Sequence, residues 1–438
     1  MKISVVSLFP ELYEPFRATS LVQRAQDAGL LSVDVRSLFS FCAPKERADG
    51  PIFGHGPGMV LRPEVIERAV DASEEIHGPA FKIFFSPHGT ALDQPLLENL
   101  YARIAERGGH SLLLPARYEG VDARVEEEYA DAVISVGDFV LLGGDLPAMM
   151  LIEGIIRLIP GVVGKAESVE CESFAGPFVD FPHYTAPVIW KRREVPEVLR
   201  SGDHAAQEKW RLKQAIDRTV KHHFSWVRSH ETNPKERREV LRAIPPHYAA
   251  LMHTGVLVQQ GVEGESSVTS IDIHDIARSS RTFGMKNYFI VTPLIDQQKI
   301  VDKLLGFWQA GEGVSYNPLR HEAVSLARLA KSLDEVVAMI EEQEGKKPLL
   351  IATSAKSGVA QLPVITYDSQ ETVWQQDRPV LFLFGTAQGL GDSILARCDY
   401  LLPPIEGFAP YNHLSVRSAA ALIFDRWLGI SIKRRNLL

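Results

Sequence analysis

Side chains that could move a proton stand in several loops of the first half of the chain. A carboxylate can take a proton from a weakly acidic group, and a guanidinium or an imidazole can stabilise the negative charge left behind. Such groups usually converge on a ligand where loops follow buried strands. The candidate acids and bases are Glu119, Asp145, Glu172 and Asp180, and the candidate donors are Arg117, Arg157, His88 and His183.

Two of these loops are rich in glycine, proline and acidic residues, and are called the glycine loops below. One apolar run ends in PARYEG (115–120), and the next ends in GDFVLLGGD, which contains Gly143 and Gly144. Glycine allows close approach of the backbone and positive φ, so the loops predict a small-molecule site at the ends of parallel strands. A site lined by backbone amides and carbonyls suits an adenine or a ribose better than a triphosphate.

Two common nucleotide-binding motifs are missing. No GxGxxG follows a strand near the start of either half, and no GxxxxGK[ST] occurs in the chain. The sequence therefore disfavours a dinucleotide-binding fold and a P-loop. A nucleotide-binding oxidoreductase is kept only as the alternative class of enzyme.

Length and composition predict a globular α/β protein of two or three domains. The 438 residues are too many for one ordinary core, and 45% hydrophobic and 23% charged residues are ordinary for a globular chain. No apolar run approaches the roughly 20 residues that span a bilayer, and the N-terminus lacks the parts of a signal peptide. We therefore expect a cytoplasmic protein with no membrane partner.

Charge and cysteine content do not identify a binding partner or a metal ligand. The net charge of −8 does not exclude RNA, because a local basic patch is enough to bind phosphates. The three cysteines lie far apart, without CxxC spacing, so the sequence predicts no cysteine-built metal site.

Strands and helices are predicted to alternate through residues 1–158. Helices are expected at 63–76, 94–107 and 146–158, which is the pattern of a doubly wound, mostly parallel sheet. The glycine- and proline-rich stretch 41–60 is too long for a connector, so we interpret it as a functional loop.

The middle of the chain changes character. Residues 160–187 show no period and are predicted to be a linker, whereas 195–229 are predicted to be helical. The helical stretch carries cations that form either a solvated face or a surface for phosphates, and charge pattern alone favours the solvated face. They are Lys209, Arg211, Lys213, Arg218 and Lys221.

Alternation of strands and helices resumes near residue 247. We expect a strand at 256–260, a helix at 319–343 and a last helix at 415–428. Glycine- and proline-rich loops again follow late strands, so the second half repeats the plan of the first half at low identity.

A run of motifs over residues 1–245 resembles the bacterial tRNA (guanine-N1) methyltransferase family of the SPOUT superfamily. The motifs are SPHG, LPARYEGVDARV, SVGDFVLLGGDLPAM, RLIPGVVG, ESFAGPFVDFPHYTAP and WRLKQAIDRT, in the family's order. The resemblance implies an α/β fold with a deep trefoil knot, S-adenosylmethionine as methyl donor and an obligate homodimer. It also implies guanine 37 in the anticodon stem-loop of tRNA as acceptor, and a Mg²⁺ ion for which the sequence shows no acidic cluster.

By matching position, the resemblance implies a cofactor pocket formed by the glycine loops and the strand end before them. Three positions differ from the family, because Ala116 replaces a common Gly, Phe139 a common Tyr and His88 a common Gln. Backbone contacts and ring stacking survive the first two changes, and the third leaves one contact unassigned. The implied cofactor-binding residues are Ser86, Pro87, Ala116, Tyr118, Glu119, Gly120, Ser135, Val136, Phe139, Leu141, Gly143, Gly144 and Pro147.

The resemblance also implies a catalytic pair. Guanine N1 carries a proton at neutral pH, so methylation needs a base for that proton and a cation for the charge that grows on O6. The family's aspartate base matches Glu172, and its arginine matches Arg157. A misplacement of about 1 Å can lower a rate on the order of a hundredfold, so with the longer Glu either the loop adjusts or activity falls. Asp180 is the fallback base, Glu170 is a weaker one, and Glu119 is a further catalytic candidate.

The second half resembles the same superfamily through three SpoU-type motifs. HDIARSSRTFG, LFLFGTAQGLG and APYNHLSVRSAAALIF match them, with Arg278 as a catalytic candidate six residues before Gly284. Ser415 can also act as the N-cap of the last helix. The implied second cofactor site comprises Gly385, Thr386, Ala387, Gly389, Ile405, Asn412, Leu414, Ser415 and Val416.

We therefore predict two knotted α/β methyltransferase domains with a small helical domain between them. The boundaries are 1–165 for the first domain, 166–187 for a linker and active-site loop, 188–247 for a helical tRNA-binding domain and 248–438 for the second domain. The second domain is expected either to methylate a second RNA substrate or to be only an RNA-binding or dimerisation module.

Overall fold

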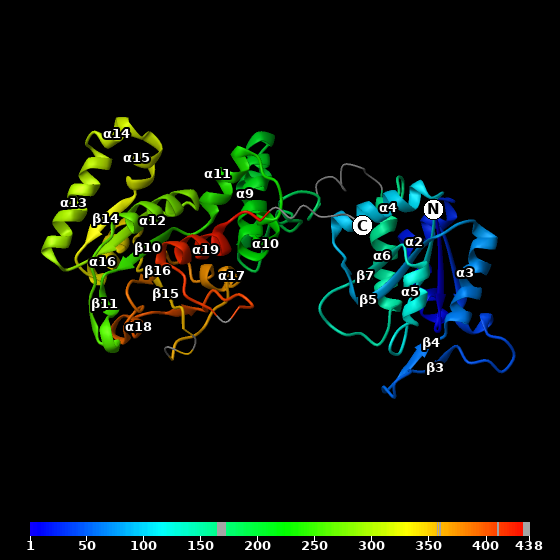
Figure 1. Ribbon diagram of the computed structural model, residues 1–438. Coiled ribbons are helices and arrows are strands. Elements are labelled where there is room, and N and C mark those ends of the chain that lie inside the picture. The colour runs from blue at the N-terminus through cyan, green and yellow to red at the C-terminus, as the bar shows by residue number, and fades with distance from the viewer. Residues whose placement is uncertain (164–171, 357, 359–360, 410, 432–438) are drawn as a thin grey trace. The chain divides into compact units, whose positions relative to one another are not determined.

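The computed structural model describes residues 1–163, 172–356, 358, 361–409 and 411–431. They form two compact units, one running from Met1 to Ala175 and the other starting at Gly176 (Figure 1). None of the helices in these ranges is both long and apolar enough to cross a bilayer.

The first unit is built on a parallel sheet of five strands. These are β1 (Lys2–Ser7), β2 (Ser32–Ser37), β5 (Phe81–Ala91), β6 (His110–Leu114) and β7 (Ala132–Ser135). Their order is β2-β1-β6-β5-β7. Strand β6 is buried along its whole length, as expected for a parallel strand that is covered on both faces.

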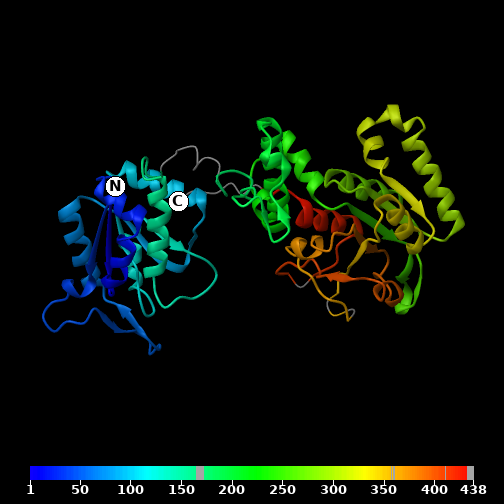
Figure 2. The ribbon, with the colours of Figure 1, turned by 180° about the vertical axis from the view of Figure 1, so that it is seen from behind.

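Helices cover both faces of this sheet (Figures 1 and 2). They are α1 (Tyr13–Arg17), α2 (Ser20–Asp27), α3 (Pro63–His77), α4 (Gln94–Glu106), α5 (Ala123–Tyr129) and α6 (Asp145–Leu158). Helices α1, α2, α4 and α6 share one core, which includes Leu100 and Ile152, and α3 and α5 share the other, which includes Val65. The three predicted helices are thus confirmed, with small shifts at their ends. The predicted functional loop at 41–60 contains two short strands, β3 (Asp49–Pro51) and β4 (Met59–Leu61).

The second unit contains a parallel sheet of six strands. These are β10 (His247–Met252), β13 (Asn287–Val291), β14 (Ala327–Ala330), β15 (Leu349–Thr353), β16 (Val380–Gly385) and β17 (Tyr400–Leu402), in the order β14-β13-β10-β16-β15-β17. Short antiparallel pairs join β11 (Thr254–Leu257) to β12 (Glu263–Glu265) and β8 (Ile189–Trp190) to β9 (Arg193–Glu194).

Helices also pack on both faces of the second sheet. Those before the sheet are α8 (Glu197–Arg200), α9 (His204–His222), α10 (Phe224–Arg228) and α11 (Pro234–Ala243). Those that follow β10 along the chain are α12 (Ser270–Thr282), α13 (Ile295–Gln309), α14 (Gly313–Tyr316), α15 (Pro318–Val324), α16 (Leu333–Glu344), α17 (Gln370–Trp374), α18 (Asp392–Leu395) and α19 (Val416–Leu428). The side chain of Ser415 accepts a hydrogen bond from the amide of Ser418, so its predicted N-cap role is confirmed.

Two predictions for the second half are wrong. The strand expected at 256–260 overlaps β11 only at 256–257, whereas the central strand is β10, which begins nine residues earlier, at 247, so that the 247/248 domain boundary falls inside it. The helix expected at 319–343 is interrupted by β14, whose residue Ala327 pairs with Tyr288 of β13. Non-local pairing decided both segments, because local apolar spacing does not distinguish a short buried strand from a helix.

The two sheets share one strand order. Numbered in chain sequence, the main strands of the first sheet lie in the order 2-1-4-3-5, and those of the second in the order 3-2-1-5-4-6. If the extra edge strand β14 is set aside, the two orders are the same. The inferred repeat of one architecture is therefore present in the topology.

Candidate active site

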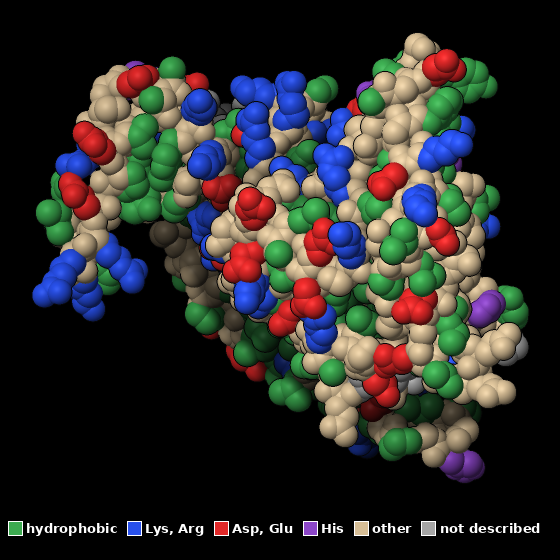
Figure 3. Space-filling view, turned by 90° about the vertical axis from the view of Figure 1, so that its left-hand side faces the viewer, with side chains coloured by type: hydrophobic (Ala, Val, Ile, Leu, Met, Phe, Trp, Pro, Cys, Tyr) green, Lys and Arg blue, Asp and Glu red, His purple; other side chains and the backbone are tan. Residues whose placement is uncertain are grey.

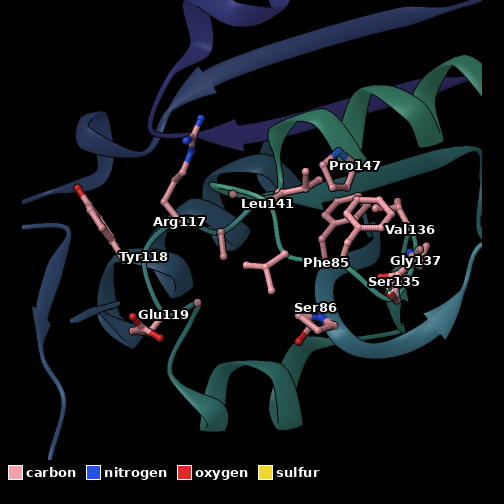
Figure 4. A pocket seen from close by; sticks show the side chains of 18 residues that line it. Phe85, Ser86, Arg117, Tyr118, Glu119, Ser135, Val136, Gly137, Leu141 and Pro147 are labelled. Atoms are coloured by element: carbon pink, nitrogen blue, oxygen red, sulfur yellow. Dashed lines mark hydrogen bonds between the residues drawn. The ribbon is translucent and has the colours of Figure 1, made fainter. Parts of the chain in front are cut away.

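The cavity of the first unit lies beside strand β5, where the neighbouring strands β6 and β7 end. Residues 85–87 within β5, the loops after β6 and β7, and the first turn of α6 enclose about 260 Å³ (Figure 4). In this view Tyr118 and Glu119 lie on one side, and Ser135 and Val136 lie on the other. All the residues that the resemblance implies for the first cofactor site line this cavity. Their role in binding the cofactor stays a prediction.

The two glycine loops touch each other through their backbones. The amide of Gly144 donates a hydrogen bond to the carbonyl of Ala116 at 2.8 Å. The backbones of Arg117 and Gly143 also form an isolated antiparallel β-bridge. A Cβ atom on Gly144 would lie 2.9 Å from the Cα of Pro115, which is closer than real Cβ contacts come. Glycine is needed here because the loops cross in direct contact.

The buried side chain of Asp145 connects these loops to the rest of the unit. Its carboxylate accepts hydrogen bonds from Ser7 Oγ at 2.5 Å and Tyr13 OH at 3.2 Å, and pairs with Arg117 Nε at 2.9 Å. The residue is 1% exposed. Burial and the neighbouring carboxylate raise the pKa of the Tyr13 hydroxyl, which keeps it a donor. We therefore assign Asp145, a candidate acid in the sequence, to holding the pocket together.

His88 has a defined role although it is not part of the cavity wall. Its Nδ1 lies 2.7 Å from Ser86 Oγ, and its Nε2 lies 2.7 Å from a carboxylate oxygen of Glu126. Ser86 lines the cavity, so this chain of contacts orients a pocket hydroxyl from outside. A histidine in place of the common glutamine therefore acts through Ser86.

The predicted catalytic pair is brought together. The guanidinium of Arg157, in the last turn of α6, donates a hydrogen bond to the carboxylate of Glu172. The two side chains are 45% and 36% exposed, so a substrate can reach both. The carboxylate can accept a proton while the guanidinium stabilises a nearby negative charge.

A second, larger cavity occupies the equivalent place in the second unit. The loops after β15, β16 and β17 and the start of α19 enclose about 560 Å³. All the residues implied for the second cofactor site line it. Asp272 and Arg417 form part of its wall as an ion pair, with Arg417 Nη1 3.3 Å from Asp272 Oδ1.

A chain of polar side chains leads from the wall of this second cavity to the buried His253. The hydroxyl of Thr386, on the wall, lies 2.5 Å from Ser266 Oγ, which in turn lies 3.0 Å from Nδ1 of His253. Burial lowers the pKa of His253 to about 4, so the ring is neutral near pH 7.

Comparison with known proteins gives the chain a family. Residues 1–228 match the family described as tRNA (Guanine-1)-methyltransferase TrmD. A relative from Oleidesulfovibrio alaskensis, named tRNA (guanine-N(1)-)-methyltransferase, is 39% identical over 98% of this chain and 99% of its own length. The chain belongs to the tRNA (Guanine-1)-methyltransferase family. Residues 246–429 match a second family, described as SAM-dependent RNA methyltransferase.

Other relatives differ in how much of the chain they cover. One with the same name from Nitratidesulfovibrio vulgaris is 36% identical over 98% of this chain and 99% of its own length. One from Alcanivorax borkumensis is 42% identical but covers 50% of this chain and 82% of its own length. Relatives with this name therefore include both chains that cover nearly all of this one and chains that cover half of it.

Two of the catalytic candidates from the sequence, Asp180 and Arg278, do not line either cavity. Asp180 belongs to the second unit, where its carbonyl accepts a hydrogen bond from Arg218. Arg278 is exposed on α12 and is not part of the second cavity's wall. Glu170 lies outside the described residues. Catalytic roles for Asp180 and Arg278 stay predictions.

The structure also identifies residues that sequence reasoning missed. Ser7 and Tyr13 come from the first strand and helix, far from every motif, and reach the pocket only through Asp145. Asp272 stands two residues before the first SpoU-type motif and Arg417 stands inside the third, but no residue pattern links them across 145 positions. Within the described part of the chain, no three His, Cys, Asp or Glu side chains gather as metal ligands, and no residues can be assigned to Mg²⁺.

Proposed function

We propose that the first unit transfers a methyl group from S-adenosylmethionine to N1 of guanine 37 in tRNA. The observation that carries the proposal is the pairing of Glu172 with Arg157 in the unit that holds the glycine-loop cavity. Family membership and the names of the full-length relatives support it.

The residues present fit the cofactor. Apolar side chains of Val136, Leu141 and Pro147 can flank an adenine ring, while the glycine loops offer peptide groups to its polar edge. Close crossing of the loops at Gly144 supports the further proposal of a trefoil knot. When bound, S-adenosylmethionine supplies a methyl group activated by a positively charged sulfur.

Glu172 and Arg157 do the remaining chemistry in this proposal. The Glu172 carboxylate takes the proton from guanine N1, which makes that nitrogen a nucleophile. The guanidinium of Arg157 stabilises the negative charge that develops on O6. The side chain of Glu172 reaches Arg157, which supports the alternative in which the loop has adjusted to Glu in place of the family's Asp. Asp180 is the alternative base.

A homodimer belongs to the same proposal. The loop beside the cavity exposes Val140 and Leu142, each 89% exposed, and Leu146 continues the apolar surface onto α6. Contiguous apolar surface of this kind is typical of protein interfaces. A second copy of this chain is the proposed occupant, and light scattering is expected to give twice the chain mass.

Recognition of tRNA is assigned to the helices before the second sheet. Lys209, Arg211 and Lys213 are exposed on α9, where they can contact phosphates of the anticodon stem. Figure 3 shows Lys and Arg side chains gathered in the upper centre of one face of the chain. A tRNA substrate also implies a cytoplasmic location.

Methylation of tRNA transcripts tests the proposal. The chain is expected to form N1-methylguanosine in a transcript with guanine at position 37, and none in a matched transcript with adenosine there. Mapping the methylated nucleoside by mass spectrometry decides the outcome. Methylation at any other position in place of guanine 37 would reject the proposed acceptor.

The second cavity disfavours the alternative in which only the first unit is catalytic. Titration calorimetry is expected to find two S-adenosylmethionine molecules per chain. A stoichiometry of one would return the second unit to a role in RNA binding or dimerisation alone.

A further inference from the structure

The family boundary and the structural boundary do not coincide. The match to the first family runs to residue 228, but the first compact unit ends at Ala175. Residues 176–228, the last part of the tRNA methyltransferase match, therefore fold with the second methyltransferase sheet.

These helices share a core with that sheet. Ile216 and Val220 of α9 and Phe224 of α10 lie in the same buried cluster as β10 and β16. The ring of Phe224 packs edge-on against Trp374 of α17, with centroids 4.7 Å apart. A shared apolar core of this kind makes the helices and the sheet one body.

Polar contacts fix the same junction. The guanidinium of Arg228, at the end of α10, donates hydrogen bonds to the carbonyls of Asp425 (2.9 Å), Arg426 (2.8 Å) and Gly429 (2.5 Å). These carbonyls are at the C-terminal end of α19, where unpaired acceptors and the helix dipole favour a cation. Arg228 thus attaches the helices to the last helix of the second unit.

Helix α19 leads from this junction to the second cavity. Its first residues, from Ser415 to Arg417, form part of the cavity wall. A helix of 13 residues is about 20 Å long, which is comparable with the width of a nucleic-acid helix. The cavity and the helices therefore lie at opposite ends of one rigid element.

The helices form a basic surface on an acidic chain. Residues 204–243, named here the helical platform, contain ten Lys and Arg against five Asp and Glu, whereas the whole chain has a net charge of −8. Lys209, Lys213 and Lys221 of α9 and Arg238 of α11 are exposed. Local positive charge of this kind attracts a phosphate backbone.

We propose that the second cavity methylates another nucleotide of the same tRNA molecule that the helical platform holds. The inference rests on the proposed function in one respect, namely that the platform binds tRNA. Because platform and cavity belong to one body, an RNA held on the platform has a nucleotide within reach of the second cavity.

In the proposed methyl transfer, the second cavity accounts for every bond and for the displaced proton. A bond forms between the methyl carbon and a nucleophilic atom of the nucleotide, and the bond from that carbon to the cofactor's sulfur breaks with its electron pair left on sulfur. The proton displaced from the nucleotide passes to the carboxylate of Asp272, which is 8% exposed and is held by Thr269 and Arg417. The carboxylate then returns the proton to solvent.

Mapping of methyl groups on one tRNA by the full chain tests the inference. With S-adenosylmethionine, a purified unmodified tRNA is expected to gain two methylated nucleosides at different positions. Asp272→Asn and, as a second variant, Arg417→Gln are expected to lose the second one at least a hundredfold. Glu172→Gln is expected to lose only the first one.

A variant of the helical platform tests whether both methylations depend on tRNA bound there, or whether the chain only has two independent active sites. Lys209→Glu combined with Lys213→Glu is expected to lower kcat/KM for both methylations at least tenfold. Lys303→Glu, an exposed lysine on α13, is the matched control and is expected to change neither. A second methylation that persists in the platform variant, or that occurs only on an RNA other than tRNA, would overturn the inference.

Failure of the proposed function is distinguishable in the same experiment. If N1-methylguanosine forms but no second methylated nucleoside does, the further inference fails alone. If the second nucleoside forms without N1-methylguanosine, the proposed first reaction fails instead.

Discussion

Arg117 and Asp145 join the two glycine loops of the first cavity through an ion pair of 2.9 Å between Nε and Oδ2. Arg117 belongs to the loop after β6, and Asp145 starts the helix that follows the loop after β7. Because Asp145 is buried, removing one of the partners that surround its carboxylate is expected to be destabilising. The ion pair thus connects two loops that line the pocket.

Replacing Asp145 with Asn should loosen both loops. Loss of one charge from a buried pair leaves Arg117 uncompensated, so we expect a loss of about 3 kcal/mol in the stability of the first unit. The KM for S-adenosylmethionine in guanine methylation should rise as well. Asp138→Asn, at an exposed position in the same loop, is the control.

Unfolding of the two units can be followed separately. All six tryptophans lie in the second unit, so tryptophan fluorescence reports on that unit alone, whereas far-UV circular dichroism reports on both. Asp145→Asn should shift only the dichroism transition of the first unit. Unchanged unfolding and unchanged KM would contradict a holding role for the ion pair.

Replacing Gly144 with Ala should separate the crossing loops. The new methyl group would meet the backbone of Pro115 at 2.9 Å, and overpacking of this kind costs about 1–3 kcal/mol. We expect the KM for S-adenosylmethionine to rise about tenfold. Gly50→Ala is the control, because its nearest neighbour would be Arg62 Cγ at 3.8 Å. Equal KM values for the two variants would argue against close crossing.

Replacing Glu172 with Gln should remove the proposed base and keep the pocket. We expect kcat for N1-methylguanosine to fall on the order of a hundredfold to ten-thousandfold. Affinity for S-adenosylmethionine, measured by calorimetry, should stay within twofold. Glu153→Gln, at an exposed position on α6, is the matched control. Persistent activity in the Glu172 variant would transfer the role of base to Asp180.

Acid should destabilise the second unit through His247. Its Nε2 accepts hydrogen bonds from the indoles of Trp374 (3.3 Å) and Trp427 (3.0 Å), and burial lowers its pKa to about 4. The unfolded chain binds a proton near pH 6.5, so this contribution to stability is complete above pH 6.5 and falls as the pH drops towards 4. Between pH 6.5 and 5 the loss is about 2 kcal/mol.

Denaturant unfolding followed by tryptophan fluorescence checks this dependence. A variant with His247→Asn should be less stable at pH 7 and should lose less stability than the native chain between pH 6.5 and 5. His222→Gln, at an exposed position, should keep the native pH dependence. Parallel pH profiles for His247→Asn and the native chain would show that another group carries the effect.

The sequence alone determined the local and the motif-borne parts of this protein. Helices such as α3, α4 and α6 follow from apolar spacing, and the loops that line the first cavity follow from motifs that place glycine where backbones meet. The motifs also placed both members of the Glu172–Arg157 pair, because each stands in a recognisable run of residues.

Tertiary structure decided what depends on contacts between distant residues. Strands β10 and β14 were misassigned because parallel pairing, and not local period, fixes them. The sequence predicts Asp145 to be a candidate acid. In the structure its carboxylate is bound by Ser7, Tyr13 and Arg117, which indicates a structural role. The packing of the helical platform against the second sheet also depends on non-local contacts, since Arg228 donates hydrogen bonds to carbonyls about two hundred residues away in the sequence. A linear pattern records spacing, whereas burial and long-range hydrogen bonding arise only when the chain folds.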